Sequence, residues 1–177
     1  MPSLLESECL LNVEELVHNN GKDHFYTMHL SYEGHEWKRL WDYAQENGLI
    51  GLSHPFITED WNKDRDYSIK ALSRTWVKQF DMFCNEMQAG DIVLVLRGWD
   101  SLLGIAEVTG PEYNFDSCLS GDNCEPFFDH VRKVKWHKTY SHDNPLKLPE
   151  PVKGFVNSLS KVKPDTQRWS LLANITI

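Results

Sequence analysis

The fold of this chain is decided by the stretch GDIVLVLRGWDSLLGIAEVTG, residues 90–110. A Gly-Asp turn opens the stretch, and the apolar, β-branched run at 92–96 predicts a buried strand. A short polar connection then leads to a second apolar run at 102–108. Two such runs joined by a short polar connection predict a β-hairpin.

A long loop and a third strand follow the hairpin. Residues 110–126 contain four Gly and Pro residues and many Asp, Asn and Ser. This composition predicts a loop too long for a simple hairpin turn, and long loops often carry function. The following segment, 127–136, ends in Lys-Val-Lys-Trp, with the lysines on one face and the apolar residues on the other. Such alternation is typical of a half-exposed strand.

The rest of the chain predicts helices and strands around this unit. Apolar residues recur at helical spacing near 37–44 and most clearly along 69–87, whereas five charged residues without periodicity predict a loop at 60–66. Shorter segments predict a helix at 13–18, strands at 25–30 and 49–52, a helical turn at 152–159 and a last strand at 168–177. The tryptophans expected in the core are Trp37, Trp41, Trp76 and Trp136.

The order of these motifs resembles a known family. Gly-Asp, an apolar strand, Leu-Gly-Ile-Ala-Glu-Val-Thr-Gly and His-Val-Arg-Lys-Val-Lys-Trp occur as in the PUA-like domains of the EVE group. Within that group the chain looks most like the N-terminal DNA-recognition domain of McrB-type, modification-dependent restriction GTPases. The resemblance covers residues 26–169 and is strongest over 87–136. It implies an α+β fold, a PUA-like (EVE/YTH-related) mixed β-barrel flanked by helices, that binds nucleic acid.

The length suits one domain over residues 1–177, with 1–23 as an N-terminal extension.

The resemblance also implies a pocket that takes up a modified base. In the related YTH readers, the pocket is walled by the end of the first strand, the strand after the first helix and the loop after the barrel hairpin. The Trp that YTH readers carry on the second segment is absent here. Trp99 is added because an apolar ring in a polar connection gains little without a partner. The predicted pocket residues are Ser31, Tyr32, Ile50, Leu52, Ser53, His54, Trp99, Tyr113 and Phe115.

Charge gives a mixed signal for nucleic-acid binding. The net charge of -8 argues against indiscriminate attraction to phosphates. The cations nevertheless gather near 63–78 and near 132–138, and each cluster fits either a phosphate-binding face or a solvated surface. The residues predicted to contact a nucleic-acid backbone are Lys63, Arg65, Arg74, Arg132, Lys133, Lys135 and Lys138.

The motifs of several enzyme classes are missing from the sequence. There is no phosphate-cradling Gly-rich loop, nucleophile elbow or His-Glu-x-x-His helix, so we expect no catalytic residues and no cofactor. No apolar stretch approaches the ~20 residues that span a bilayer, and the N-terminus lacks a basic secretory start, which favours a cytoplasmic protein without a membrane partner. Cys118 and Cys124 with His130 leave a metal site open. The spacing instead favours reduced thiols at Cys9, Cys84, Cys118 and Cys124.

These features favour a non-catalytic nucleic-acid recognition module. We expect a base-flipping reader of modified DNA, which would target a separate GTPase motor and nuclease subunit of a restriction system. An extruded base would regain its stacking between aromatic rings while polar groups read its edge. Two alternatives stay open. One is a PUA-like RNA-binding protein or modified-RNA reader, since the sequence does not choose between deoxyribose and ribose. The other is a protein-interaction domain whose acidic surface meets a basic partner.

Overall fold

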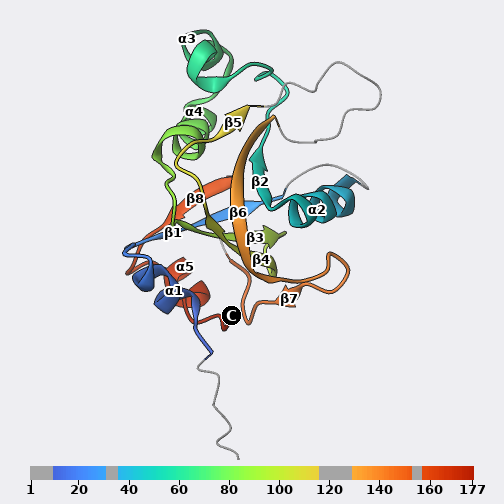
Figure 1. The fold of residues 1–177 in the computed structure, drawn as a ribbon, viewed down its shortest axis with the longest axis vertical. Helices are drawn as coiled ribbons and strands as arrows, with labels where there is room; N and C mark the ends of the chain where they lie inside the picture. Colours follow the sequence, from blue (N-terminus) through green and yellow to red (C-terminus); the bar gives the residue numbers. More distant parts are fainter. Residues whose placement is uncertain (1–9, 31–35, 116–128, 153–156) are drawn as a thin grey trace, which may run out of the picture.

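The computed structural model describes residues 10–30, 36–115, 129–152 and 157–177. It is an α+β structure in which a curled, mixed sheet forms a half-barrel flanked by helices (Figure 1). In chain order the elements are α1 (Val13–Asn19), β1 (Phe25–His29), α2 (Glu36–Asn47), β2 (Leu49–Leu52), α3 (Trp61–Ala71), α4 (Arg74–Asp81), the π-helical turn η1 (Met82–Glu86), β3 (Ile92–Arg97), β4 (Ser101–Val108), β5 (Asn114–Phe115), β6 (His130–Thr139), β7 (Leu146–Lys147), β8 (Leu159–Val162) and α5 (Gln167–Leu172).

The sheet is built on the predicted hairpin, which the structure confirms. β3 and β4 pair antiparallel across a turn in which Gly98 has a φ of 61°. β4 pairs antiparallel with β6, and β6 with β2, whereas β1 lies parallel to β3 and antiparallel to β8. The resulting order is β2-β6-β4-β3-β1-β8, with β5 beside β6 and β7 beside β4. The predicted strands at 25–30 and 49–52 are thus also confirmed.

Both faces of the central strands are buried, which explains the unbroken apolar run of β3. Val93 and Val95 belong to a core cluster with residues of α2, α4 and η1, which we call the α4 cluster. Ile92, Leu94 and Leu96 belong to a second cluster with residues of α1 and α5, the α1 cluster. A strand that faces a hydrophobic layer on each side has no polar alternation, as β3 shows.

A close contact in the α4 cluster depends on a glycine of β4. Trp41 of α2 is fully buried, as predicted, and meets Trp136 of β6 edge to face, with ring centroids 5.1 Å apart. A Cβ atom added to Gly104 would lie 2.8 Å from the ring of Trp41 and 3.0 Å from that of Trp136. The two indoles therefore pack over a position where only hydrogen fits. The side chain of Trp37 lies outside the described part of the chain.

Near α3 and α4 one prediction is wrong and another is confirmed only in part, and helix caps give the reason. The predicted loop at 60–66 is the start of α3, because the Asp60 carboxylate accepts a hydrogen bond from the amide of Asn62. The predicted helix along 69–87 is interrupted, because Leu72 is extended and the hydroxyl of Ser73 caps a new helix at Trp76. Its last turn, η1, is π-helical. A polar side chain that satisfies free amides can begin a helix within a charged segment.

The C-terminal predictions are also corrected, whereas the N-terminal helix at 13–18 is confirmed as α1. The predicted last strand at 168–177 contains a helix, α5, which Thr166 caps by accepting from the amide of Trp169. The predicted helical turn at 152–159 ends at Leu159, which begins β8, and residues 153–156 lie outside the described residues. Of the cysteines, the structure describes Cys84, a buried free thiol, in agreement with the prediction. The described helices include none that is both long and apolar enough to cross a bilayer.

Candidate functional site

Aromatic side chains gather where β2 ends and β6 begins, at the upper end of the molecule in Figure 1. Their centre is His130, the first residue of β6, which is fully buried and lies opposite Leu52 of β2 and Phe115 of β5. Because β6 pairs with two strands here, the backbone holds the imidazole in a fixed place. We call the group the His130 cluster: His54, Trp61, Trp76, Phe80, Tyr113, Phe115 and His130.

Three rings surround the imidazole of His130. Tyr113 stacks on it, with ring centroids 5.7 Å apart and planes 24° from parallel. Phe80 of α4 meets it edge-on at 5.1 Å, and Phe115 lies tilted at the same distance. The chain of rings continues from Phe80 to Trp76 at 6.3 Å. Aromatic contacts of this kind stabilise by about 1 kcal/mol each beyond simple burial, so the ring contacts help to hold the cluster together.

Burial decides the charge state of His130. Removal from water lowers its pKa to about 4, so the imidazole is neutral at neutral pH. Its Nε2 lies 3.2 Å from the carbonyl oxygen of Glu59, which can only accept a hydrogen bond. The Nε2 atom therefore carries the proton and donates. Nδ1 is buried without a hydrogen-bond partner among the described residues. A buried ring nitrogen of this kind costs free energy, and it is not peculiar to His130, because Nε2 of His142 is another such atom in the described part of the chain.

The hydroxyl group of Tyr113 is held by hydrogen bonds to the start of α3. It donates to the carboxylate of Asp60 and accepts from the amide of Asn62 at 3.3 Å. Burial, followed by the bond to Asp60, raises the pKa of Tyr113. Burial opposes ionisation of Asp60, but the bonds from Tyr113 and Asn62 together hold the pKa of its carboxyl below the usual value. The N-terminal cap of α3 therefore also positions the ring that stacks on His130.

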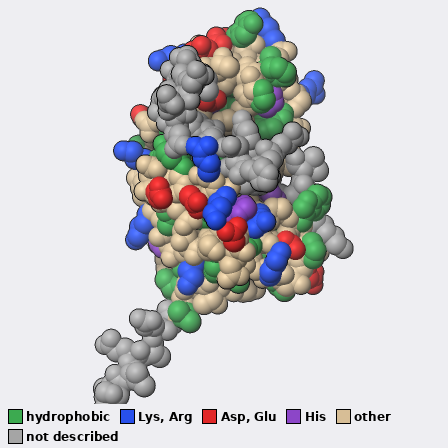
Figure 2. All heavy atoms as spheres, turned by 90° about the vertical axis from the view of Figure 1, so that its right-hand side faces the viewer, with side chains coloured by type: hydrophobic (Ala, Val, Ile, Leu, Met, Phe, Trp, Pro, Cys, Tyr) green, Lys and Arg blue, Asp and Glu red, His purple; other side chains and the backbone are tan. Residues whose placement is uncertain are grey.

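The accessible edge of the cluster is the turn between β2 and α3. His54 and Ile57 form an isolated bridge, and the amide of Phe56 donates to Nδ1 of His54 at 3.2 Å. Ile57 is buried, whereas the ring of Phe56 is 70% exposed. His54 in turn contacts Trp76 edge-on, with centroids 4.7 Å apart. Figure 2 shows the side of the molecule that lies on the right in Figure 1. Hydrophobic side chains gather at its upper end, at the height of α3 in Figure 1.

The structure brings some of the predicted pocket residues together. His54, Tyr113 and Phe115 all belong to the His130 cluster, and the hydroxyl of neighbouring Ser53 accepts from the amide of Asp129 at 3.1 Å. Trp99 does not join them. It is 55% exposed at the tip of the β3–β4 hairpin, near the far end of the half-barrel.

Two predicted pocket residues prove to be core residues. Ile50 and Leu52 are 2% and 4% exposed within the α4 cluster, because β2 turns these side chains toward the helices. They therefore present almost no accessible surface to a base. Ser31 and Tyr32 lie outside the described residues.

Arg132 corrects the prediction of a basic face on β6. Its side chain is 1% exposed, and its guanidinium donates to the carbonyl oxygens of Phe83 at 2.6 Å, Cys84 at 3.1 Å and Pro111 at 3.3 Å. These bonds satisfy carbonyls of the π-helical turn η1 and of the segment before β5. Arg132 therefore joins two elements inside the molecule and is not available to a phosphate.

The other predicted cations of β6 lie on the surface. Lys133, Lys135 and Lys138 are exposed, and none has an ion-pair partner within the described ranges. We call them the β6 lysine row. Lys135 lies opposite Glu107 of β4, but the carboxylate of Glu107 contacts Nε2 of His137 at 2.8 Å instead.

The cations predicted on α3 and α4 differ in their freedom. Lys63 is exposed, with its ammonium 3.9 Å from the carboxylate of Asp60. Arg65 is held by Asp81 through two hydrogen bonds, at 2.9 Å and 2.7 Å. Arg74, the first residue of α4, is exposed. Of these three, Arg74 is therefore the side chain best able to meet an anion.

Sequence reasoning missed the residues at the centre of the site. The sequence pattern suggests His130 only as a metal ligand with two cysteines, and Trp76 only as a core residue. Phe56 carried no pattern at all. A signal for His130 existed in the alternation of β6, which places it on the same face as Arg132 and Val134, toward the interior.

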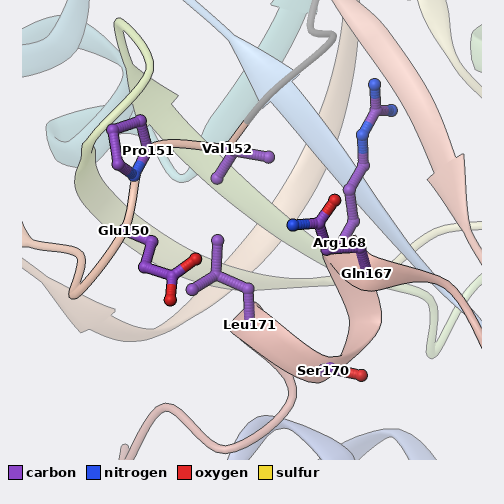
Figure 3. Close-up of a pocket in the computed structure, with 7 residues that line it drawn as sticks. All are labelled: Glu150, Pro151, Val152, Gln167, Arg168, Ser170 and Leu171. Carbon is purple, nitrogen blue, oxygen red and sulfur yellow. The ribbon is translucent and has the colours of Figure 1, made fainter.

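A separate cavity of about 210 Å³ lies beside α5 (Figure 3). In Figure 3 the guanidinium of Arg168 points away from the carboxylate of Glu150, so the polar groups do not converge on one point. None of the predicted site residues lines this cavity. Its lining residues are Glu150, Pro151, Val152, Gln167, Arg168, Ser170 and Leu171.

Comparison with known proteins gives a family without a stated function. The model of a domain of unknown function, DUF8426, matches residues 26–160. The match extends from β1 into β8 and includes every residue of the His130 cluster. No curated protein matches the chain.

Proposed function

Since the chain belongs to the DUF8426 family, which carries no assigned function, we propose one from the site: a non-catalytic, PUA-like nucleic-acid recognition module. One observation carries the proposal. A single strand, β6, begins inside the His130 cluster and continues into the β6 lysine row. Nucleic-acid readers need both kinds of group, because cations on phosphates position the ligand while contacts to the base specify it. The curled mixed sheet agrees with the barrel that the sequence resemblance implies.

The accessible edge of the His130 cluster has the chemistry to hold an extruded base. Such a base has lost a few kcal/mol of stacking, which exposed or half-exposed rings can replace. Phe56, His54 and Trp76 supply those rings. Burial lowers the pKa of His54, and its Nδ1 accepts from the Phe56 amide, which leaves Nε2–H as a donor for the base edge.

The net charge restricts how this protein can bind. With -8 overall, the three lysines of the β6 lysine row provide only local attraction to phosphates. Affinity that depends on phosphates alone would be weak and steeply salt-dependent. Base capture at the His130 cluster must then contribute a large share of the binding free energy. This favours a reader of a particular base over a general nucleic-acid coat.

From the sequence resemblance we further propose that the ligand is modified DNA. In that case the chain would be the specificity domain of a modification-dependent restriction system, with a GTPase motor and a nuclease subunit as partners. An RNA reader is the alternative, because no described contact selects ribose or deoxyribose. The proposal does not depend on Ile50, Leu52 or Trp99, which lie outside the accessible edge.

The test is binding of short labelled duplexes at one fixed salt concentration. Duplexes would carry methylated cytosine, hydroxymethylated cytosine, methylated adenine or no modification, alongside matched RNA. We expect one modified ligand to be preferred. Phe56→Ala and Tyr113→Ala should each reduce that preference by roughly 1–3 kcal/mol if the ring stacks on the base or holds the stacking platform.

Trp99→Ala is the matched control, because it removes another exposed aromatic ring that lies away from the His130 cluster. It should leave the preference unchanged. Equal affinity of the unaltered protein for every ligand, or an equal loss of all affinities in the cluster variants, would contradict base capture.

A further inference from the structure

A groove of about 380 Å³ lies between α3 and α4, apart from the His130 cluster. Trp76 and Phe80 of α4 face the cluster, whereas Arg74, Lys78 and Asp81 of the same helix line the groove. The two surfaces thus use different faces of one helix. A volume of this size accommodates several side chains of a ligand.

The floor of the groove is apolar. Ile69 and Leu72, at the end of α3, and Val77 of α4 are half-buried and pack against the α4 cluster from outside. Their remaining exposed surface would be covered by an apolar ligand group, and removing apolar surface from water favours binding. A nucleic-acid backbone is mostly polar and charged, so the apolar floor favours a different class of ligand.

The charges around the groove are unevenly compensated. Both acidic residues of the lining already have partners: Asp81 binds Arg65 and also accepts from the indole of Trp61, and Glu86 lies 3.3 Å from the ammonium of Lys161. Arg74 and Lys78, one helical turn apart on α4, have no ion-pair partner in the part of the chain that the structure describes. The charge that a ligand meets here is therefore positive, although the chain carries -8.

We propose that this groove binds an acidic, amphipathic peptide segment of a partner protein. Apolar side chains three or four residues apart on the segment would lie on Ile69, Leu72 and Val77, as in helix-in-groove recognition. Carboxylates beside them would pair with Arg74 and Lys78. The sequence suggests a protein contact in which the acidic surface of this chain meets a basic partner. The groove has the opposite sign, because Arg74 and Lys78 would meet an acidic partner. The inference is independent of nucleic-acid binding.

The probe is a library of random 12-residue peptides displayed on phage and selected on the intact chain, with counter-selection on the double variant Arg74→Glu, Lys78→Glu. Both substitutions are on exposed positions. Glutamate at position 74 suits the helix dipole in the first turn of α4, and the loss of the cation from the last turn at position 78 is a small cost on an exposed face, so the variant should fold. We expect the selected peptides to be rich in Asp and Glu, poor in Lys and Arg, and apolar at helical spacing.

Synthetic copies of the selected peptides then give the decisive affinities. Binding should weaken at least tenfold in the double variant and return when glutamates of the peptide are changed to lysines. The matched control is Lys133→Glu, Lys135→Glu, which makes the same change in net charge on β6 and should leave peptide binding within twofold.

Three results would overturn the proposal that the groove binds a peptide. They are the absence of any selected peptide, equal losses of peptide affinity in both double variants, and a loss of duplex binding in the Arg74, Lys78 variant without any effect on peptides. The last result would assign these cations to phosphates. If duplexes fail to bind the unaltered protein while peptides behave as expected, the proposed function fails and the groove stands.

Discussion

The two sides of the sheet bury very different chemistry. The α1 cluster is mainly aliphatic, with one ring pair between Phe25 and Trp169, and it serves to pack α1 and α5 on the sheet. The side that carries the α4 cluster encloses a fully buried histidine and a charged arginine, at His130 and Arg132, whereas His29 on the α1 side, whose pKa burial also lowers, is only partly buried. Burying such groups costs free energy that aliphatic packing avoids. Departures of this kind are expected near functional sites, so the comparison directs attention to the start of β6.

The largest effect on stability should come from Arg132. Arg132→Met keeps much of the volume but leaves the carbonyl groups of Phe83, Cys84 and Pro111 without their donor. We expect a loss of about 3–5 kcal/mol in the free energy of unfolding, measured with urea. The neighbouring Lys133→Ala, on the exposed face of the same strand, should change it by no more than about 0.5 kcal/mol. Similar losses in the two variants would remove the distinction between the faces of β6.

Acid should destabilise the protein through His130. The folded pKa of about 4 lies below the usual 6.5, so between these values the unfolded chain binds a proton that the folded chain does not. Stability is therefore lost as the pH falls from 6.5 to 4, by up to about 3 kcal/mol for this group. His130→Phe keeps an aromatic ring but removes the titrating group. It should therefore reduce the slope of unfolding free energy against pH by the contribution of about one bound proton. His29, whose pKa burial also lowers to about 4, stays in both proteins as an internal control.

Gly104 tests how tightly the α4 cluster is packed. In Gly104→Ala the new methyl group would lie 2.8 Å from Trp41 and 3.0 Å from Trp136, so one indole must shift. We expect a cost of about 1–3 kcal/mol in thermal or urea unfolding. A useful control is Gly110→Ala, where the added group meets nothing closer than 4.0 Å. Equal stability of the two variants would show that the indole pair adapts freely.

The smallest energetic change concerns the β6 lysine row. Replacing Lys133 and Lys135 with Ala should weaken binding to all nucleic-acid sequences alike and leave stability nearly unchanged. Each lost phosphate contact should lower the slope of log affinity against log salt concentration by about one unit. The measurement is a titration at several salt concentrations. An unaltered slope would assign these lysines to an ordinary solvated face.

Local patterns were sufficient to predict the hairpin, α1, α2 and the first two strands, because short-range apolar spacing determines them. They failed at α3 and α5 and missed the break before α4, because Asp60, Ser73 and Thr166 begin helices there by capping free amides. The charged segment before Tyr67 concealed the cap at Asp60, and the single apolar stripe along 69–87 concealed the cap at Ser73. Capping depends on one side chain, whereas periodicity is summed over many.

The site was less predictable because distant residues form it. Phe80 and Glu59 lie 50 and 71 residues before His130 in the chain, and Tyr113 lies 17 residues before it. No window of sequence contains them together. The alternation of β6 did hold one usable signal, since it places Arg132 and Val134 on the face opposite Lys133 and Lys135. Grouping all cations of that strand by sequence proximity overlooked this difference.

The most direct test of base capture is a titration of the indole N–H signals of the ¹⁵N-labelled protein with the preferred modified duplex. Trp76 belongs to the His130 cluster and contacts His54, whereas Trp169 packs in the α1 cluster on the other side of the sheet. The signal of Trp76 should shift in proportion to binding, more strongly than with an unmodified duplex, while that of Trp169 stays in place. Saturable binding that leaves Trp76 unchanged, or that shifts Trp169 instead, would contradict recognition at the His130 cluster.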